Sequence, residues 1–282
     1  SEGLRQQVAD YYNCMARLDD LVGELLAKLK ASGKYDDTLI VYMGDHGADL
    51  IRGKRTCYEG GVRVPLIVRL PKGKAGQERR ELVSSLDLFP TFLEMSGAEP
   101  VPDLPGSSLL PLLRGEKPKW RQYMPTEFHL HSAHNYYPQR AIRNDRYKLI
   151  ENLQPGEVDP GYEFTVNRFF GQQVMAALPR APKKVQVAYA LMKRPPKYQL
   201  YDLQMDPYEF VNLAKDPAHR SAFDELSTEL TRWRRATHDP LLNQDNVSRL
   251  KAEIDAIRQG NDFNKAKIGQ WKYPEYFFKK GN

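Results

Sequence analysis

The sequence predicts an α/β fold followed by a smaller C-terminal subdomain with antiparallel strands. Two observations lead to this prediction: helical and strand-like apolar patterns alternate over the first part of the chain, and the pattern changes after about residue 115. The chain has 282 residues, of which 41% are hydrophobic and 28% are charged, as is usual for a globular protein. A chain of this length can bury a sizeable core, in one large domain or in two.

The first part of the chain begins with a helical pattern and continues with two strand-like runs. Apolar residues over 4–29 recur at steps of three and four, which predicts a helix that stops at Ser32-Gly33. The apolar runs 38–43 and 65–70 predict two short, buried strands. Helices beside buried strands indicate part of an α/β sheet.

A second helix is expected over 85–96. Ser84 or Ser85 can serve as its N-cap, because a serine hydroxyl accepts a bond from the first free backbone amides. Gly97 gives the stop signal, since glycine adopts the left-handed conformation that ends many helices.

The pattern changes beyond the polar connector 115–119, so we place a main domain over 1–119 and a subdomain over 120–282. The subdomain is expected to contain a hairpin turning at Asn144-Asp145, a strand and a long amphipathic helix. These three elements are assigned to 141–150, 198–202 and 217–237. The prolines within 164–201 predict a loop-bearing insertion rather than a regular helix.

Composition and charge exclude several classes of protein. No apolar run approaches the roughly 18–20 residues of a membrane-spanning helix, and no signal peptide is visible in residues 1–10. Two cysteines exclude a disulfide scaffold and a multi-cysteine metal site. The net charge of +6 suits an anionic partner without identifying it, and we expect no nucleic acid as partner and no membrane span.

The most informative segment is Gly44-Asp45-His46-Gly47, directly after the first predicted strand. Ligands of open α/β sheets sit beyond the carboxyl ends of strands, and a neighbouring Asp and His at such a position can both reach one cation. The alternative is a turn with a satisfied Asp and a surface His. A second segment, 53–65, runs straight into the next predicted strand and bears on the choice.

The two segments together resemble the sulfatase family. Asp45-His46-Gly47, Lys54 nine residues after the Asp, and then Tyr-Glu-Gly-Gly-x-Arg-x-Pro over 58–65 are similar to its second half. Further segments extend the likeness: Ser84–Thr91, Gly106–Leu113, Leu200–Asp202, Asp206–Glu209 and Asn212–Ala214. Within the family, Tyr137–Arg143 and Thr237–Pro240 resemble the heparan N-sulfatases (sulfamidases).

The resemblance implies an alkaline-phosphatase-like mixed sheet flanked by helices, and roles for three residues. Asp45 and His46 would bind a divalent cation, usually Ca²⁺ in this family, and Lys54 would contact the sulfate as a catalytic residue. Many family members have Asn at the position of His46. Because Ca²⁺ prefers oxygen ligands and imidazole suits Mn²⁺, Zn²⁺ or iron better, Mn²⁺ or another metal stays open.

Two parts of the family's machinery are missing from this sequence. Sulfatases use a formylglycine made from the first residue of Cys/Ser-x-Pro/Ala-x-Arg, and neither Cys14 nor Cys57 fits that pattern. Cys14 lies in a helical apolar pattern and is expected to be a small buried side chain. The Asp-Asp metal pair of the family's N-terminal part is absent too. We therefore expect a missing N-terminal half as partner, without which the chain is unstable and inactive.

The substrate is expected to contact the segment 126–135. Alternation would place His129 and His131 on one side of a strand, as hydrogen-bonded surface residues or as a substrate wall. The candidate substrate-binding residues are Glu127, His129, His131, His134 and Arg140. Segment 164–201 has seven basic residues and no acidic one, so it either steers an anionic glycan or is a solvated face.

The chain is thus expected to be the C-terminal portion of a formylglycine-dependent sulfatase. It would hydrolyse N- or O-linked sulfate on a sulfated polysaccharide or glycosaminoglycan-like sugar, in a periplasmic, secreted or lysosomal setting. The Asp-His pair is also similar to the phosphodiester and phosphonate hydrolases of the same superfamily, so such a hydrolase is an alternative. A non-catalytic, glycan-binding relic is another.

Overall fold

The computed structural model describes residues 2–73, 75–131, 135–259, 272–273 and 275. The chain forms two compact units, Ser1–Asp45 with Val64–Met124, and His46–Arg63 with Pro125–Asn282. The last boundary between the units, at 124/125, lies five residues beyond the predicted domain boundary at 119/120. The loop 46–63 groups with the C-terminal unit.

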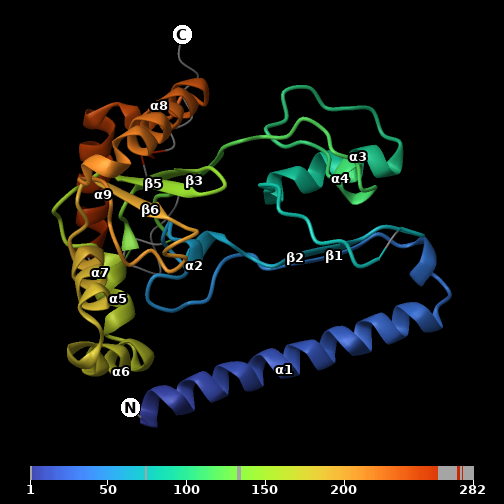
Figure 1. Ribbon diagram of the computed structural model, residues 1–282, viewed down its shortest axis with the longest axis horizontal. Coiled ribbons are helices and arrows are strands. Elements are labelled where there is room, and N and C mark those ends of the chain that lie inside the picture. The colour runs from blue at the N-terminus through green and yellow to red at the C-terminus, as the bar shows by residue number, and fades with distance from the viewer. Residues whose placement is uncertain (1, 74, 132–134, 260–271, 274, 276–282) are drawn as a thin grey trace. The chain divides into compact units, whose positions relative to one another are not determined.

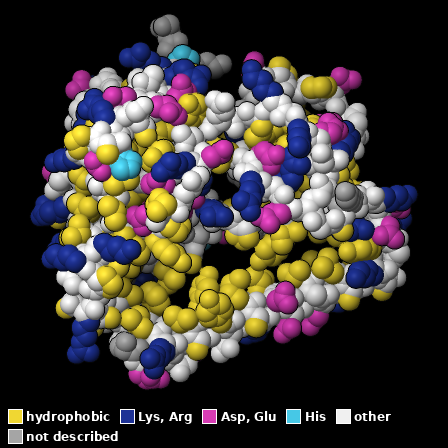
Figure 2. Space-filling view, viewed as in Figure 1, with side chains coloured by type: hydrophobic (Ala, Val, Ile, Leu, Met, Phe, Trp, Pro, Cys, Tyr) yellow, Lys and Arg dark blue, Asp and Glu magenta, His cyan; other side chains and the backbone are white. Residues whose placement is uncertain are grey.

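The first unit begins with the predicted helix, α1 (Glu2–Ala31), which is confirmed (Figure 1). None of the residues Glu2–Ala31 is buried. Figure 2 shows hydrophobic side chains in a row along this helix. They include Val8, Tyr11, Met15, Leu18 and Leu25, each more than a third exposed. An apolar face of this size normally packs against other structure.

The two predicted strands are present as β1 (Ile40–Met43) and β2 (Leu66–Arg69), after the short 3₁₀ turn η1 (Tyr35–Asp37). They pair antiparallel, with Ile40 opposite Arg69. The prediction that both strands are buried is wrong for the described residues, because no residue of either strand is buried. The apolar content that suggested burial therefore lies open on this pair of strands.

The predicted second helix is confirmed as η2 (Ser85–Asp87) followed by α3 (Leu88–Ser96). Ser84 caps its start in a capping box with Asp87, and Gly97 ends it at φ 69°. Asp87 is fully buried, is paired with Arg121 and accepts the amide of Ser107 at 2.8 Å. That bond holds the segment leading into the short helix α4 (Leu110–Leu113).

A four-stranded sheet organises the second unit, in the order β3-β4-β5-β6. The strands are β3 (Met124–Phe128), β4 (Gln139–Arg143), β5 (Tyr147–Asn152) and β6 (Tyr198–Asp202). The predicted hairpin is confirmed, because β4 and β5 pair antiparallel with Ala141 opposite Ile150. The side chain of Asn144 accepts the amides of Arg146 and Tyr147 and so closes the turn.

Helices fill the segment for which a loop-bearing insertion was predicted, so that prediction is wrong. They are α5 (Pro160–Val166), α6 (Phe169–Ala177), η4 (Leu178–Arg180) and α7 (Lys183–Lys193). Pro160 and Pro179 lie in the first turns of α5 and η4, and Pro182 directly precedes α7, where a missing amide removes no helical bond. Pro195 and Pro196 follow the end of α7. Apolar side chains within α5 and α7, such as Tyr162 and Met192, pack into the core together with Ile150 and Tyr201 of the sheet.

The predicted long helix is confirmed as η5 (Pro217–His219) and α8 (Arg220–Ala236). The turn η6 (Pro240–Leu242) and a further helix, α9 (Gln244–Gln259), follow it. Val247, Leu250 and Ile254 of α9 form a second core cluster with Tyr136 and Leu153. Among the described residues no helix is both long enough and apolar enough to cross a membrane.

Candidate functional site

The loop 46–63, here called the Lys54 loop, is folded by close backbone contacts between its two ends. The amide of Gly47 donates to the carbonyl of Gly61 at 2.9 Å, and the amide of Lys54 donates to the carbonyl of Ala48 at 2.8 Å. A Cβ added at Gly47 would lie 1.8 Å from the carbonyl oxygen of Gly60. Glycine is therefore required at 47, because a larger residue would force the two ends apart.

Four charged side chains form a buried network beneath this loop, here called the Glu59 network. The Glu59 carboxylate of α2 (Glu59–Val62) accepts from Arg143 at 2.6 Å and from Lys148 at 3.0 Å. Lys148 also lies 3.5 Å from Glu209, whose carboxylate accepts the Glu59 amide at 2.7 Å. The network thus joins the Lys54 loop to the hairpin β4–β5 and to the turn after β6.

The two glutamates of the network differ in their ionisation. Burial acts to raise the pKa of Glu59, but Lys148 and Arg143 hold it below the usual range. The pKa of Glu209 is raised by burial, which outweighs the opposing charges of Lys148 and Arg52. Glu59 is therefore the carboxylate that these cations stabilise most.

Arg52 anchors the same loop from another direction. Its guanidinium lies 3.9 Å from the ring centroid of Tyr58 and donates to the carbonyl of Glu209 at 2.6 Å. Arg52 has φ 65°, a conformation that costs a non-glycine residue about 1–2 kcal/mol. The buried contacts of the guanidinium offset that strain, and they fix the backbone two residues before Lys54.

Of the predicted metal and catalytic residues, Asp45 directly precedes the Lys54 loop, His46 is its first residue and Lys54 lies in its middle. Asp45 and His46 are exposed and follow β1 directly, and the Nδ1 atom of His46 lies 2.8 Å from the carbonyl of Gly47. Lys54 is partly buried. Its backbone bond to Ala48 brings it near the residue two positions after His46. The convergence of the three side chains on one ligand stays a prediction.

The part of the chain that the structure describes does not supply a complete donor set for the metal expected from the sequence. The described residues include no group of three or more His, Cys, Asp or Glu side chains that could hold a metal ion. Asp45 and His46 offer one carboxylate and one imidazole, whereas Ca²⁺ takes six to eight oxygen ligands in general. These two residues therefore do not form a metal site by themselves.

Three of the predicted substrate-binding residues, Glu127, His129 and Arg140, lie together. The Glu127 carboxylate lies 3.6 Å from Nε2 of His129 and 3.4 Å from Nε of Arg140. The bond with His129 and the charge of Arg140 lower the pKa of Glu127. About half of its side chain is exposed, so this carboxylate can contact a ligand.

The other expectations for this segment need correction. Because β3 ends at Phe128, His129 and His131 lie beyond it and do not alternate along a strand. The amide of His131 donates to the Asn135 side chain at 2.9 Å. His134 lies outside the described residues.

Arg140 is fully buried, so its predicted direct contact with substrate is wrong for this structure. Its guanidinium binds both carboxylate oxygens of Asp239, at 2.9 and 2.8 Å. Arg234 of α8 donates to the same carboxylate at 2.7 Å. The two segments that resemble the heparan N-sulfatases, 137–143 and 237–240, are thus the two sides of one ion pair, a contact that sequence spacing did not reveal.

Comparisons with known proteins point to the same family as the sequence motifs do. The sulfatase family model matches residues 1–98. An ulvan-active sulfatase of Formosa agariphila is 31% identical over 83% of this chain and 44% of its own length. Human N-sulphoglucosamine sulphohydrolase is 31% identical over 84% of this chain and 49% of its own length. The chain therefore spans less than half of each of these curated relatives.

Solved structures of sulfatases and of a related hydrolase have a fold similar to that of this chain. A 2-O glycosaminoglycan sulfatase superimposes with a TM-score of 0.60 and 25% identity, over 79% of this chain and 41% of the other. A phosphonate monoester hydrolase of Silicibacter pomeroyi superimposes with a TM-score of 0.55 and 27% identity, over 77% and 38%. The chain belongs to the sulfatase family. Its fold is accordingly the alkaline-phosphatase-like α/β fold that was predicted.

Cys57 of this sulfatase chain does not have the environment of a nucleophile precursor. Cys57 is fully buried, and burial raises the pKa of its thiol to about 11. Its amide donates to the Gln139 side chain at 3.0 Å, so the residue serves the packing of the Lys54 loop. Cys14 is exposed, and the prediction that it is buried in its helix is wrong.

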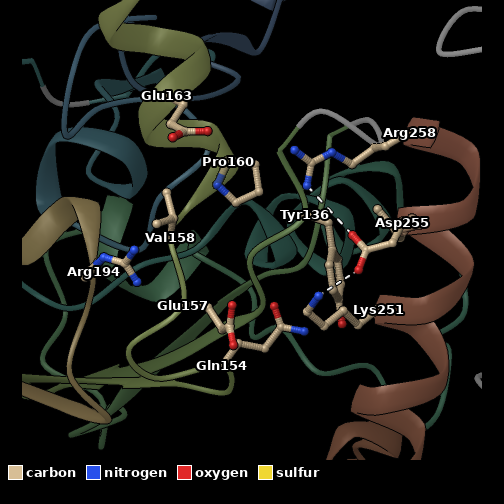
Figure 3. A pocket seen from close by; sticks show the side chains of 11 residues that line it. Tyr136, Gln154, Glu157, Val158, Pro160, Glu163, Arg194, Lys251, Asp255 and Arg258 are labelled. Carbon is tan, nitrogen blue, oxygen red and sulfur yellow. Dashed lines mark hydrogen bonds and ion pairs between the residues drawn. The ribbon is translucent and has the colours of Figure 1, made fainter. Parts of the chain in front are cut away.

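A pocket of about 230 Å³ lies elsewhere in the second unit of this sulfatase, beside α9 (Figure 3). Asp255 is paired within it, at 2.6 Å from Lys251 and 3.8 Å from Arg258, and Arg194 donates to the carbonyl of Gly156 at 2.9 Å. Its lining includes three acidic and three basic residues: Glu157, Glu163, Asp255, Arg194, Lys251 and Arg258. With no excess of either charge, the pocket offers no reason to bind sulfate.

Sequence reasoning missed the Glu59 network and a second cluster around Asp49. In that cluster Asp49 is paired with both Arg55 and Arg168. The only signal for it was the basic character of segment 164–201, which contains Arg168. The partner, a single Asp more than a hundred residues earlier, gave no signal of its own.

Proposed function

We propose that this chain belongs to a formylglycine-dependent sulfatase that hydrolyses N- or O-linked sulfate on a sulfated glycan. The observation that carries the proposal is the anchored Lys54 loop in a chain of the sulfatase family. Glu59 pairs with two cations beneath this loop, so the backbone at Lys54 is fixed before any ligand arrives.

Lys54 would act as a positive charge on a sulfate oxygen. A compact ammonium ion can bind one oxygen of the anion and offset the charge that develops when the S–O or S–N bond breaks. Arg168, an exposed residue of the basic segment 164–201, would help to attract an anionic glycan. Glu127 and His129 would contact sugar hydroxyl or amine groups at the edge of β3.

We propose that the N-terminal half of the protein supplies the nucleophile and the remaining metal ligands. The chain spans 38–49% of the length of its first four curated relatives, and Cys57 is buried with a thiol that stays protonated. The exposed apolar row on α1 and the open strands β1 and β2 are surfaces that this half would cover. Asp45 and His46 would then be two of several ligands of a divalent cation, Ca²⁺ or Mn²⁺.

Hydrolysis of a phosphonate or phosphodiester is the alternative activity. A phosphonate monoester hydrolase shares the fold, and an Asp-His pair is similar to the pair in such hydrolases. The anion that Lys54 contacts would then be a phosphonate or phosphodiester. The periplasmic, secreted or lysosomal location stays a prediction.

Substrate comparison tests the proposal. The protein, expressed at its natural full length, would be given N-sulfated glucosamine, an O-sulfated sugar and a phosphonate monoester at equal concentrations. We expect release of inorganic sulfate and a higher kcat/KM for a sulfated sugar than for the phosphonate. A preference for the phosphonate would contradict the sulfatase proposal, and binding of sulfated glycan without turnover would support a glycan-binding relic instead.

A further inference from the structure

Asp49 of the Lys54 loop forms a cluster with two arginines from different parts of the second unit. It is paired with Arg55 of the same loop and with Arg168 just before α6, whose Nη1 lies 3.3 Å away. The ring of Phe164 lies near both arginines, with its centroid 5.2 Å from the Arg55 guanidinium and 4.4 Å from that of Arg168. The cluster thus ties the basic segment 164–201 to the loop that contains Lys54.

Arg55 is the anchor of the cluster. Only 5% of its side chain is exposed, and besides Asp49 it donates to the Thr165 hydroxyl at 3.3 Å. Its φ of 73° is unfavourable for a residue with a side chain, and the buried contacts offset that cost. Because Arg55 directly follows Lys54 in the chain, this anchor also fixes the neighbouring backbone.

Arg168 is different, because 54% of its side chain is exposed. A guanidinium has five N–H donors in a planar fork, and the contact with Asp49 uses one edge of it. The exposed part therefore keeps donors that face solvent. Such a fork matches the oxygen atoms of a sulfate or a carboxylate.

The charges of the cluster leave an excess of positive charge at the surface. A hydrogen bond from Arg55 lowers the pKa of Asp49, and the charges of Arg55, Arg168 and Lys54 lower it further. Asp49 is therefore ionised at neutral pH, and three cations surround one carboxylate. Because only 5% of the Arg55 side chain is exposed, its charge is not available at the surface. Lys54 and Arg168 remain as the accessible cations.

We propose that Arg168 forms a second anion-binding subsite beside Lys54, so that the preferred substrate carries a second anionic group next to the sulfate that is removed. That group is a further sulfate or a sugar carboxylate. The inference rests on the proposed function, since it names the substrate class of the same loop. Arg168 is thereby a specificity-determining residue: it binds the substrate and takes no part in bond cleavage.

The test compares Arg168→Gln with a matched control, Arg180→Gln, which removes an exposed arginine from the same basic segment. The substrates are N-sulfated glucosamine, glucosamine bearing both N- and 6-O-sulfate, and an N-sulfated disaccharide with a uronic acid. We expect Arg168→Gln to lower kcat/KM about 10-fold or more for the doubly charged substrates, as for loss of one charged hydrogen bond. The singly sulfated sugar and the control variant should change by less than about twofold.

The two doubly charged substrates distinguish a sulfate from a carboxylate as the second group. An equal loss for all three substrates, or no loss, would overturn the proposed subsite. Arg168→Lys keeps the charge but not the fork, and it should retain more of the preference than Arg168→Gln.

A binding measurement separates this inference from the proposed function. If the wild-type protein releases no sulfate, the function proposal fails, and calorimetry with the disulfated glucosamine then decides the subsite alone. Weaker binding by Arg168→Gln than by Arg180→Gln supports it, and equal binding overturns it.

Discussion

Replacing Lys148 by methionine removes the central cation of the Glu59 network. The lysine side chain is only 1% exposed, and its Nζ atom lies 3.0 Å from Glu59 and 3.5 Å from Glu209. Glu59 keeps Arg143 at 2.6 Å, but among the described residues Glu209 keeps only the amide of Glu59 as a close donor to its carboxylate, at 2.7 Å. Breaking a buried pair in this way costs about 3–5 kcal/mol of unfolding free energy.

The loss of unfolding free energy in Lys148→Met should depend on pH, because the Glu209 carboxylate that loses its cation can be protonated. Burial already raises the pKa of Glu209, and removal of Lys148 raises it further. A folded state that binds protons more tightly than the unfolded state becomes less stable as pH rises. We therefore expect Lys148→Met to be more destabilising at pH 8 than at pH 5, with a slope of at most about 1.4 kcal/mol per pH unit.

Urea unfolding of the full-length protein, followed by circular dichroism at both pH values, measures this difference. Lys184→Met, in an exposed first turn of α7, is the matched control and should cost less than about 0.5 kcal/mol. Hydrogen exchange adds a local measurement, and peptides from 46–63 should exchange faster in Lys148→Met. An unchanged stability, or a larger loss at pH 5, would refute the role given to the network.

Three other substitutions or modifications test separate contacts. Gly47→Ala should open the Lys54 loop and lower the reaction rate, because the added Cβ would strike the backbone of Gly60. Gly23→Ala is the contrasting variant: its Cβ would meet nothing within 4 Å, so it should stabilise α1 by up to about 1 kcal/mol. Thermal melts measure the stability of both variants, and sulfate-release rates measure their activity. Arg140→Gln should cost about 3–5 kcal/mol in urea unfolding yet leave KM unchanged, and a raised KM at normal stability would restore its predicted contact with substrate. Iodoacetamide should modify Cys14 in the folded protein and Cys57 only after unfolding, as mass spectrometry would show.

Local chemistry allowed the sequence to predict most elements correctly. The apolar spacing of α1, the cap at Ser84 with the stop at Gly97, and the Asn144 turn each depend on nearby residues, and each is present. The helices within 164–201 were missed because the prolines at 179–182 and 195–196 were interpreted as breakers, although they stand at the starts of η4 and α7 and after the end of α7. Burial of β1 and β2 depends on groups distant in the chain, which local patterns do not contain.

The candidate site shows the same division. Asp45 and His46 were candidates because they directly follow a predicted strand, and the role of Lys54 came from the resemblance of this segment to the sulfatase family. The partners of the Lys54 loop were not predictable, because they are distant in the sequence. Glu59 binds Lys148, which lies 89 residues further along the chain, and Asp49 binds Arg168, which lies 119 residues further along. Neither distance leaves a periodic trace in a single sequence.

Substitution of Lys54 decides whether its loop is the sulfate-binding part of this protein. Sulfate release by Lys54→Ala would be measured at full length against Lys184→Ala, a lysine on an exposed helix surface. We expect kcat/KM to fall by about two orders of magnitude or more for Lys54→Ala, as for loss of a group that stabilises developing charge, and to stay within about twofold for the control. A kcat/KM for Lys54→Ala equal to that of the control would contradict the proposed role of Lys54 in sulfate binding and catalysis.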